Sequence, residues 1–176
     1  LLILLALTVG TGLRAQNHSD KRSISRQYPV TLETTLEIRN KYGKIQVETW
    51  EKDSVAIYAD IFLTESSASR LRNLQDDIHI DFTATGTYII AKTVIESEKG
   101  RLARELKSLE NILTGSNKQV EINYRVMVPL YLDVVLQNKF GDIYMDDLDG
   151  RLDIDLSNGV LNASRVEGNS SISLSL

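Results

Sequence analysis

The sequence contains no cysteine, and it has only two prolines and two histidines among its 176 residues. Without cysteine the chain has no disulfide, no thiol nucleophile and no cysteine ligand for zinc. The histidines, His18 and His79, lie far apart in the sequence, which argues against a histidine-based triad or zinc site. The phosphate-binding patterns Gly-Lys-Ser/Thr and Gly-x-Gly-x-x-Gly are also absent. We therefore expect no catalytic, cofactor-binding or metal-binding residue, no cofactor and no enzymatic activity.

A large excess of charge of one sign is also missing. The chain has 20 Lys and Arg residues against 24 Asp and Glu residues, for a formal net charge of −4. This mild acidity argues against a nucleic acid or an anionic membrane as the partner. Hydrophobic residues make up 42% of the chain, which is too many for intrinsic disorder. The length suits one domain with room for an extension.

The apolar run at residues 1–9 is too short to cross a bilayer, which takes roughly 20 apolar residues. It is interrupted only by Thr8, and small residues and Ala15 follow it. This pattern fits the hydrophobic part of a secretory signal peptide that is cleaved after Ala15. The sequence thus predicts an incomplete signal peptide at residues 1–15, lacking an initiator Met and a charged leading region. A flexible mature N-terminus is expected at residues 16–27.

A signal peptide implies export to the periplasm, the outer surface or the extracellular space, with no membrane span in the mature chain. No cysteine follows the apolar run, which excludes a lipid anchor on an N-terminal cysteine. The alternative for residues 1–9 is a buried strand or helix of a cytosolic fold.

Alternation of apolar and polar residues dominates the sequence from residue 30 onward and is typical of half-buried β-strands. It is clearest over residues 120–128, and Pro129 marks the expected end of that strand. Residues 65–76 and residues 101–113 have helical spacing instead. We expect a mainly β fold with one or two short inserted helices. A mobile linker is the alternative for residues 101–113.

An internal repeat occupies the C-terminal end, where residues 141–150 can be laid over residues 159–168. At this offset Ile143 falls on Leu161, and Ile154 falls on Ile172. Each unit holds two short strands and glycine-containing turns. Because one such unit cannot bury its own apolar face, we expect the units to stack as β-solenoid (β-helix-like) coils of about 18 residues. A plain antiparallel meander is the alternative.

Two further observations concern the limits of this repeat. Residues 40–43 and residues 138–141 have nearly the same sequence, Asn-Lys-Tyr-Gly and Asn-Lys-Phe-Gly. In the repeat Trp50 falls on the position of Leu148, so we expect Trp50 in the core. Residues 171–176 alternate strictly and then stop. We therefore expect a β-rich domain at residues 28–176 that is truncated at its C-terminal end, in a fragment of a longer exported protein.

Four short sequence segments carry a resemblance to a known group of proteins. They are residues 40–53, which begin with Asn-Lys-Tyr-Gly and end with Trp-Glu-Lys-Asp, and residues 124–129, 138–143 and 157–161. With them, the chain from about residue 28 to its end resembles the bacterial putative-adhesin family of β-solenoid domains, many of which are domains of unknown function. The apolar start is similar to export signals common in Bacteroidetes. The resemblance implies a fold rather than an activity, and it carries over no catalytic residue.

Acidic residues gather near the C-terminal end, at positions 142, 146, 147, 149, 153 and 155. Their spacing does not form a known calcium loop. Asp153 and Asp155 flank Ile154, so we expect them on a solvated strand face, with a metal site as the alternative. A polysaccharide-cleaving β-helix would need clustered carboxylates or a basic residue on one face, but Asp146 and Asp147 are adjacent and point to opposite sides of a regular strand. Arg151 and Arg165 are the basic residues that coils would bring near them.

Five aromatic residues are candidates for a sugar-stacking surface: Tyr42, Trp50, Tyr58, Tyr131 and Tyr144. Tyr58, Tyr131 and Tyr144 fall in the polar phase of their strands, so we expect them to be exposed. The alternative is that they are simply residues that favour strands. Asn162 and Asn169 begin glycosylation sequons, which arise readily by chance in a stretch rich in Ser and Asn.

We therefore expect an exported, non-enzymatic β-solenoid domain that acts as an adhesin or a cell-envelope surface protein. Its partner is expected to be a surface glycan or an envelope protein. One alternative is a periplasmic structural or signalling protein linked to envelope stress. A carbohydrate-active β-helix enzyme is the other.

Overall fold

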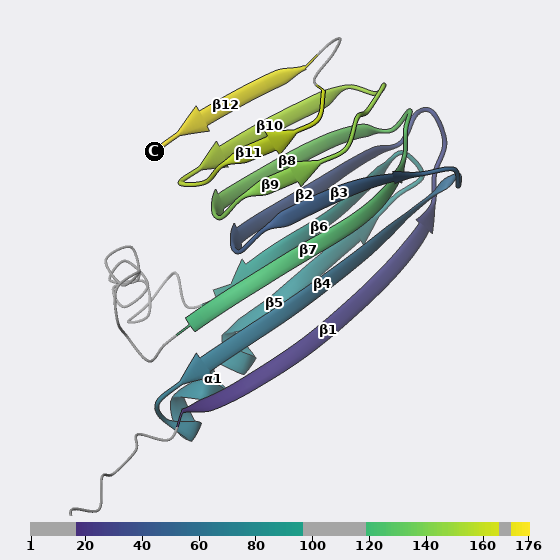
Figure 1. Ribbon diagram of the computed structural model, residues 1–176. Helices are drawn as coiled ribbons and strands as arrows, with labels where there is room; N and C mark the ends of the chain where they lie inside the picture. Colours follow the sequence, from purple (N-terminus) through teal and green to yellow (C-terminus); the bar gives the residue numbers. More distant parts are fainter. Residues whose placement is uncertain (1–16, 97–118, 166–169) are drawn as a thin grey trace, which may run out of the picture.

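The computed structural model describes residues 17–96, 119–165 and 170–176, and the chain there is mainly β (Figure 1). The signal peptide predicted at residues 1–15 and the helix or linker predicted at residues 101–113 lie outside this part of the chain. The described elements are β1 (His18–Pro29), β2 (Thr35–Tyr42), β3 (Ile45–Trp50), β4 (Ser54–Glu65), α1 (Ala68–Asp77), β5 (Ile78–Ala84), β6 (Tyr88–Ile95), β7 (Gln119–Pro129), β8 (Asp133–Phe140), β9 (Ile143–Met145), β10 (Leu152–Ser157), β11 (Leu161–Ala163) and β12 (Ser171–Ser175).

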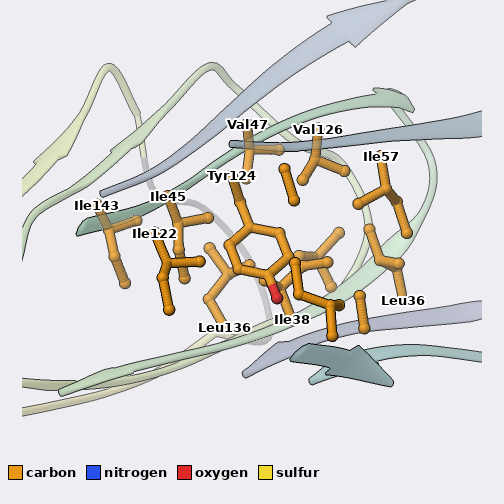
Figure 2. Close-up of a cluster of buried hydrophobic side chains, with 14 of the residues drawn as sticks. Leu36, Ile38, Ile45, Val47, Ile57, Ile122, Tyr124, Val126, Leu136 and Ile143 are labelled. Carbon is orange, nitrogen blue, oxygen red and sulfur yellow. The ribbon is translucent and has the colours of Figure 1, made fainter. Parts of the chain in front are cut away.

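The strands form two six-stranded sheets that lie face to face (Figure 1). Sheet A has the order β1-β4-β7-β3-β9-β11, and sheet B has the order β12-β10-β8-β2-β6-β5. The core lies between them. In Figure 2, Ile45, Ile122 and Tyr124 of sheet A extend toward Ile38 and Leu136 of sheet B, and all five side chains are fully buried. Apolar residues at every second position of both sheets therefore produce one continuous core.

Both sheets are mixed, so the β-solenoid predicted for the C-terminal end is not confirmed. From β7 to β11 in sheet A and from β6 to β12 in sheet B the neighbours are parallel, whereas β1, β4 and β7 pair antiparallel, as do β5 and β6. The sequence has no glycine between Gly43 and Gly86. Within this region β4 runs over 12 residues and pairs antiparallel with both β1 and β7.

The offset of the sequence repeat appears as strand register. β10 pairs with β8 and with β12 in parallel, so that Ile154 lies between Leu136 and Ile172. β11 pairs with β9 in the same way, and Leu161 lies beside Ile143. Each of these paired residues is separated from its partner by the same offset as the repeat. The sequence repeat therefore describes which strands are neighbours in this part of both sheets.

Two tight turns that contain glycine lie side by side, one between β2 and β3 and the other between β8 and β9. We call such a turn a corner. Gly43 and Gly141 have φ angles of 116° and 138°, a region that L side chains rarely adopt. A Cβ atom on Gly141 would lie 2.1 Å from the carbonyl oxygen of Gly43, and one on Gly159 would lie 2.1 Å from that of Gly141. We call these three residues the glycine column. Only glycine permits the backbones to approach this closely.

Asparagine side chains complete the corners. The Asn138 Nδ2 donates to the carbonyl oxygens of Gly43 and Gly141, both at 2.9 Å. The Asn40 Nδ2 donates to the Ile122 carbonyl at 2.8 Å, which joins the two sheets. Beside them the rings of Tyr42 and Phe140 stack with centroids 5.4 Å apart. The sequence that is repeated at residues 40–43 and 138–141 thus forms the same kind of corner in both places.

The N-terminal segment differs from its prediction. Residues 16–27 were expected to be flexible, but β1 begins at His18 and pairs antiparallel with β4 over its full length. Arg22 on β1 donates to the carbonyl oxygens of Gln75 at 3.1 Å and Ile78 at 3.0 Å, at the end of α1. The strand therefore has both a partner strand and a contact with the helix.

The helix predicted at residues 65–76 is confirmed as α1, whose Leu71 and Leu74 are buried. Trp50 was expected in the core but is only half-buried, because its indole N–H donates to the Ser54 carbonyl at 2.7 Å across the turn between β3 and β4. No helix within residues 17–96, 119–165 and 170–176 is long and apolar enough to cross a membrane.

Candidate functional site: the outer face of sheet A

One row of side chains crosses the outer face of sheet A from edge to edge. Strand register places its members side by side on β1, β4, β7, β3, β9 and β11, and we call it the central row: Ser25, Tyr58, Arg125, Gln46, Tyr144 and Asn162. The residues before and after each member on the four inner strands are buried. Since side chains alternate along a strand, the central row faces away from the core.

Two hollows lie along this row and share Gln46. The first has a volume of about 540 Å³. Its polar walls are Ser23, Ser25, Lys44, Gln46, Tyr58, Asp60, Asn123 and Arg125. The second has a volume of about 340 Å³. Its polar walls are Gln46, Glu48, Tyr144, Asp146, Asn162 and Ser164. Together the hollows extend over all six strands of the sheet.

Several side chains of the first hollow are held by their neighbours. The Arg125 guanidinium lies over the Tyr58 ring, 4.9 Å from its centroid. The Asn123 Oδ1 accepts the Lys44 backbone N–H at 2.9 Å, and the Asn123 Nδ2 donates to Glu121 at 2.7 Å. These contacts orient Arg125 and Asn123 before any ligand arrives, which lowers the entropy cost of binding.

Tyr144 is the main aromatic side chain of the second hollow and is 39% exposed. Its phenol donates to the Asp142 carboxylate at 3.1 Å, and this hydrogen bond raises the pKa of Tyr144. The Gln46 Nε2 donates to Glu48 at 2.8 Å. The hollow thus combines an oriented ring with amide and carboxylate groups.

The arrangement can bind an extended polar chain. Strands in a sheet lie about 4.8 Å apart, so the central row offers one polar or aromatic side chain at each such step. Tyr58 and Tyr144 are three strands apart and therefore roughly 14 Å apart across the sheet. Rings with hydrogen-bonding neighbours are suited to a ligand that has both apolar faces and hydroxyl groups, as sugars do.

The acidic side chains near the C-terminal end mostly accept hydrogen bonds from backbone N–H groups or face the solvent. Asp153 and Asp155 are exposed and alternate with buried residues, so the predicted solvated face is confirmed. Asp142 accepts the Val160 N–H at 2.9 Å, and Asp146 accepts the Thr49 N–H at 3.2 Å. Of the residues that the structure describes, no three His, Asp or Glu side chains gather as metal ligands would.

The remaining predicted features are dispersed. Asp147 and Arg165 do come together across the repeat, at 3.7 Å. Tyr58 is 40% exposed, as expected, whereas Tyr131 is half-buried and donates to Asp53 at 2.9 Å. The other positions fall as follows: Tyr42 stacks on Phe140, Arg151 is exposed beside Asp133, His79 lies 3.3 Å from Asp81, His18 begins β1, Asn162 is exposed on β11, and Asn169 lies outside the described residues.

Sequence reasoning found Tyr58 and Tyr144 but missed their neighbours in the central row. Ser25, Arg125 and Gln46 come from strands far apart in the chain, and only the register brings them together. The sequence does place all three at polar positions in the apolar–polar alternation of their strands, which predicts that they face outward. Phase alone does not predict which strands become neighbours.

Comparison with known proteins gives structural neighbours only. No family model matches the chain, and no curated protein matches it. A crystal structure of a putative cell adhesion protein from Clostridium sporogenes matches with a TM-score of 0.42 and 10% identity, over 81% of this chain and 59% of that one. A putative adhesin from Bacteroides fragilis matches with a TM-score of 0.31 and 12% identity, over 80% and 61%.

A putative adhesin from Parabacteroides distasonis matches with a TM-score of 0.27 and 8% identity, over 81% of this chain and 65% of that one. The chain thus spans about three-fifths of the length of these structures. These neighbours carry the name that the sequence resemblance suggested. At such identities and TM-scores, the function proposed below depends on the chain's own geometry.

Proposed function

We propose that this chain is an exported, non-enzymatic domain that acts as an adhesin by binding an extended glycan across the outer face of sheet A. The observation that supports this function is the central row, which presents outward side chains on six successive strands. Binding is spread along the row, so it needs no deep pocket and no reactive group. Many moderate contacts in line are well suited to holding a polymer.

The proposal includes the finer fold prediction. The parallel units at the C-terminal end are coils of a β-solenoid, and the constant offset between them makes each coil add one step to the binding face. Asn162 lies beside Tyr144 at this offset, and both line the second hollow. The solenoid thereby sets the length of the binding surface.

Export is part of the same proposal. The apolar run at residues 1–9 acts as a signal peptide and brings the domain to the periplasm, the outer surface or the extracellular space. An adhesin must lie outside the cell. Protease shaving of intact cells that make the tagged full-length protein tests this: loss of the tag without lysis is expected. Protection until the outer membrane is breached would instead favour a periplasmic structural or signalling protein.

The binding face is tested with a Tyr144→Ala variant of the whole chain on an array of linear neutral glycans. We expect the wild type to retain at least one glycan, and we expect the variant to bind it about tenfold more weakly, or about 1.4 kcal/mol. Tyr131→Ala is the matched control, because Tyr131 lies between β7 and β8 and lines neither hollow. Equal binding by wild type and Tyr144→Ala would contradict the proposal.

A further inference from the structure

A third hollow lies on sheet B, among residues of β2, β6 and β8. Its volume is about 1030 Å³, and four cationic side chains line it: Arg39, Lys41, Lys92 and Lys139. The same walls carry Gln137 and a single carboxylate, Glu96. We call this site the basic hollow. Such a gathering of positive charge is unexpected in a chain whose net charge is −4.

The register sets these cations side by side. Arg39 on β2 pairs directly with Lys92 on β6. Lys41 lies beside Lys139, because Asn40 pairs with Asn138 one position earlier along β2 and β8. Like charges on directly opposed residues destabilise a sheet. A bound anion would reduce the repulsion within these two pairs.

Ion pairs within the protein neutralise only part of this charge. Arg39 pairs with Glu37, and Lys41 has partners of its own. In residues 17–96, 119–165 and 170–176, neither Lys92 nor Lys139 forms an ion pair, and both are exposed. Lys139 lies over the Phe140 ring at 5.4 Å, which leaves its ammonium group available to a ligand.

The surroundings restrict the kind of anion. Beyond Gln137 in the same cross-strand row comes Asp155 on β10, and Asp153 is exposed on the same face. On the other side, Asp81 lies opposite Lys92 and pairs with His79. A long uniform polyanion such as a nucleic acid would be repelled by these carboxylates. The charge pattern therefore fits a ligand with negative charge in one place and neutral polar groups beside it.

The hollow also differs from a membrane-binding surface. The large hydrophobic side chains that are exposed in the described part of the chain do not include any that line the basic hollow. Concave walls with amide groups are better matched to a chain molecule than to a flat lipid surface.

From the paired cations, the hollow and the flanking carboxylates, we infer that the basic hollow binds the carboxylate of an acidic sugar within a polysaccharide. Lys92 and Lys139 contact the carboxylate, and Gln137 bonds to sugar hydroxyl groups. This site lies on the other sheet from the central row, so the inference does not depend on the function proposed above.

The probe is a linear hexamer of galacturonic acid, titrated into the whole chain by calorimetry, with a neutral hexamer of glucose as its counterpart. We expect the uronate hexamer to bind and its affinity to fall as salt is added. A Lys92→Gln, Lys139→Gln double variant should lose at least tenfold in affinity. The matched control is Lys21→Gln, Lys52→Gln, which removes the same charge from exposed residues outside the hollow and should bind normally.

Three outcomes would overturn the inference. One is that the uronate hexamer does not bind the wild type, and another is that both double variants lose affinity equally. The third is tighter binding of phosphatidylglycerol vesicles or duplex DNA that also depends on Lys92 and Lys139, which would make the partner a membrane or a nucleic acid. Lys92→Gln, Lys139→Gln should leave neutral-glycan binding by the central row unchanged, so failure at one site is distinguishable from failure at the other. The melting temperature of the hollow variant, expected to equal or exceed that of the wild type, excludes unfolding as the cause.

Discussion

At the scale of single residues, the corners between strands depend on the absence of a side chain. Gly141 has a positive φ angle and would place a Cβ atom 2.1 Å from the backbone of Gly43. Gly86 has nothing within 4 Å of the equivalent position. Two glycines of one sequence thus differ completely in what a methyl group would meet.

We expect Gly141→Ala to lower the free energy of unfolding by about 3 kcal/mol or more, because it combines backbone strain with a backbone clash. Gly86→Ala is the control and should change stability by less than about 1 kcal/mol. Urea denaturation of both variants measures the difference. Similar losses in the two variants would show that the glycine column does not constrain the corner.

Tyr124 gives the core a dependence on alkaline pH. Burial raises the pKa of its phenol, which shares a hydrogen bond of 2.9 Å with Thr93. Above the ordinary tyrosine pKa of 10.0, the unfolded chain releases this proton while the folded chain keeps it. The contribution of Tyr124 to the free energy of unfolding is therefore fully present below the ordinary tyrosine pKa, and it is lost as the pH rises through the folded-state pKa.

We expect the stability of the wild type to fall above about pH 10 by up to about 1.4 kcal/mol per pH unit through Tyr124. Tyr124→Phe should remove this part of the slope and lower stability at neutral pH by about 1 kcal/mol, because it deletes a buried hydrogen bond. Urea titrations at a series of alkaline pH values compare the two proteins. Parallel slopes would mean that Tyr124 ionises as readily in the folded state as in the unfolded chain.

Residue types predicted the corners well and predicted side-chain burial less well. The Asn and Gly residues of the repeated phrase form turns, as the sequence indicates. Trp50 was assigned to the core by its place in the repeat, yet its N–H needs a partner and finds the Ser54 carbonyl near the surface.

At the scale of elements, β1 shows where periodicity fails as a signal. Its inward positions include Asp20 and Arg22, and Ile24 and Tyr28 are its main apolar residues, so the alternation is weak. The strand forms because β4 offers a full edge of backbone groups along its whole length. That partner is remote in the chain and is not visible in the segment's own sequence. In α1, by contrast, the apolar spacing is local and predicts the helix correctly.

Arg22 joins β1 to α1 through two hydrogen bonds to carbonyl groups at the end of the helix. We expect Arg22→Ala to lower the free energy of unfolding by about 1–2 kcal/mol, since a charged donor is lost from half-buried carbonyls. Lys21→Ala, one residue away and on the outer face, should have little effect. Amide hydrogen exchange should show faster opening of α1 in the Arg22 variant only. Exchange rates equal to those of the wild type would mean that the strand does not stabilise the helix.

At the scale of the whole molecule, two sheets share one core although the chain passes between them repeatedly. The buried residues of both sheets form a single cluster, in which α1 takes part through Leu71 and Leu74. The order of the strands was not predictable from the sequence. β2 and β8 end in nearly the same sequence and do become neighbours, but five strands, β3 to β7, and α1 lie between them in the chain.

One core implies one unfolding transition. Trp50 is the sole tryptophan, at the turn between β3 and β4 of sheet A, so its fluorescence reports on that end of the sheet. Circular dichroism in the far ultraviolet reports on both sheets. We expect the two signals to change with the same midpoint in urea. A fluorescence midpoint clearly below the other would show that the part of sheet A around the turn between β3 and β4 unfolds separately.

The glycine column also bears on how such a gene can change. Because Gly141 and Gly159 stand one register unit apart, an in-frame duplication of the codons for one whole unit would give every new backbone a neighbour that it already fits. An insertion of another length within a strand would shift the apolar residues that follow it away from their counterparts on the next strand. Selection on the extent of the two sheets can therefore act by whole units, so that unequal recombination lengthens or shortens the protein without redesigning its core.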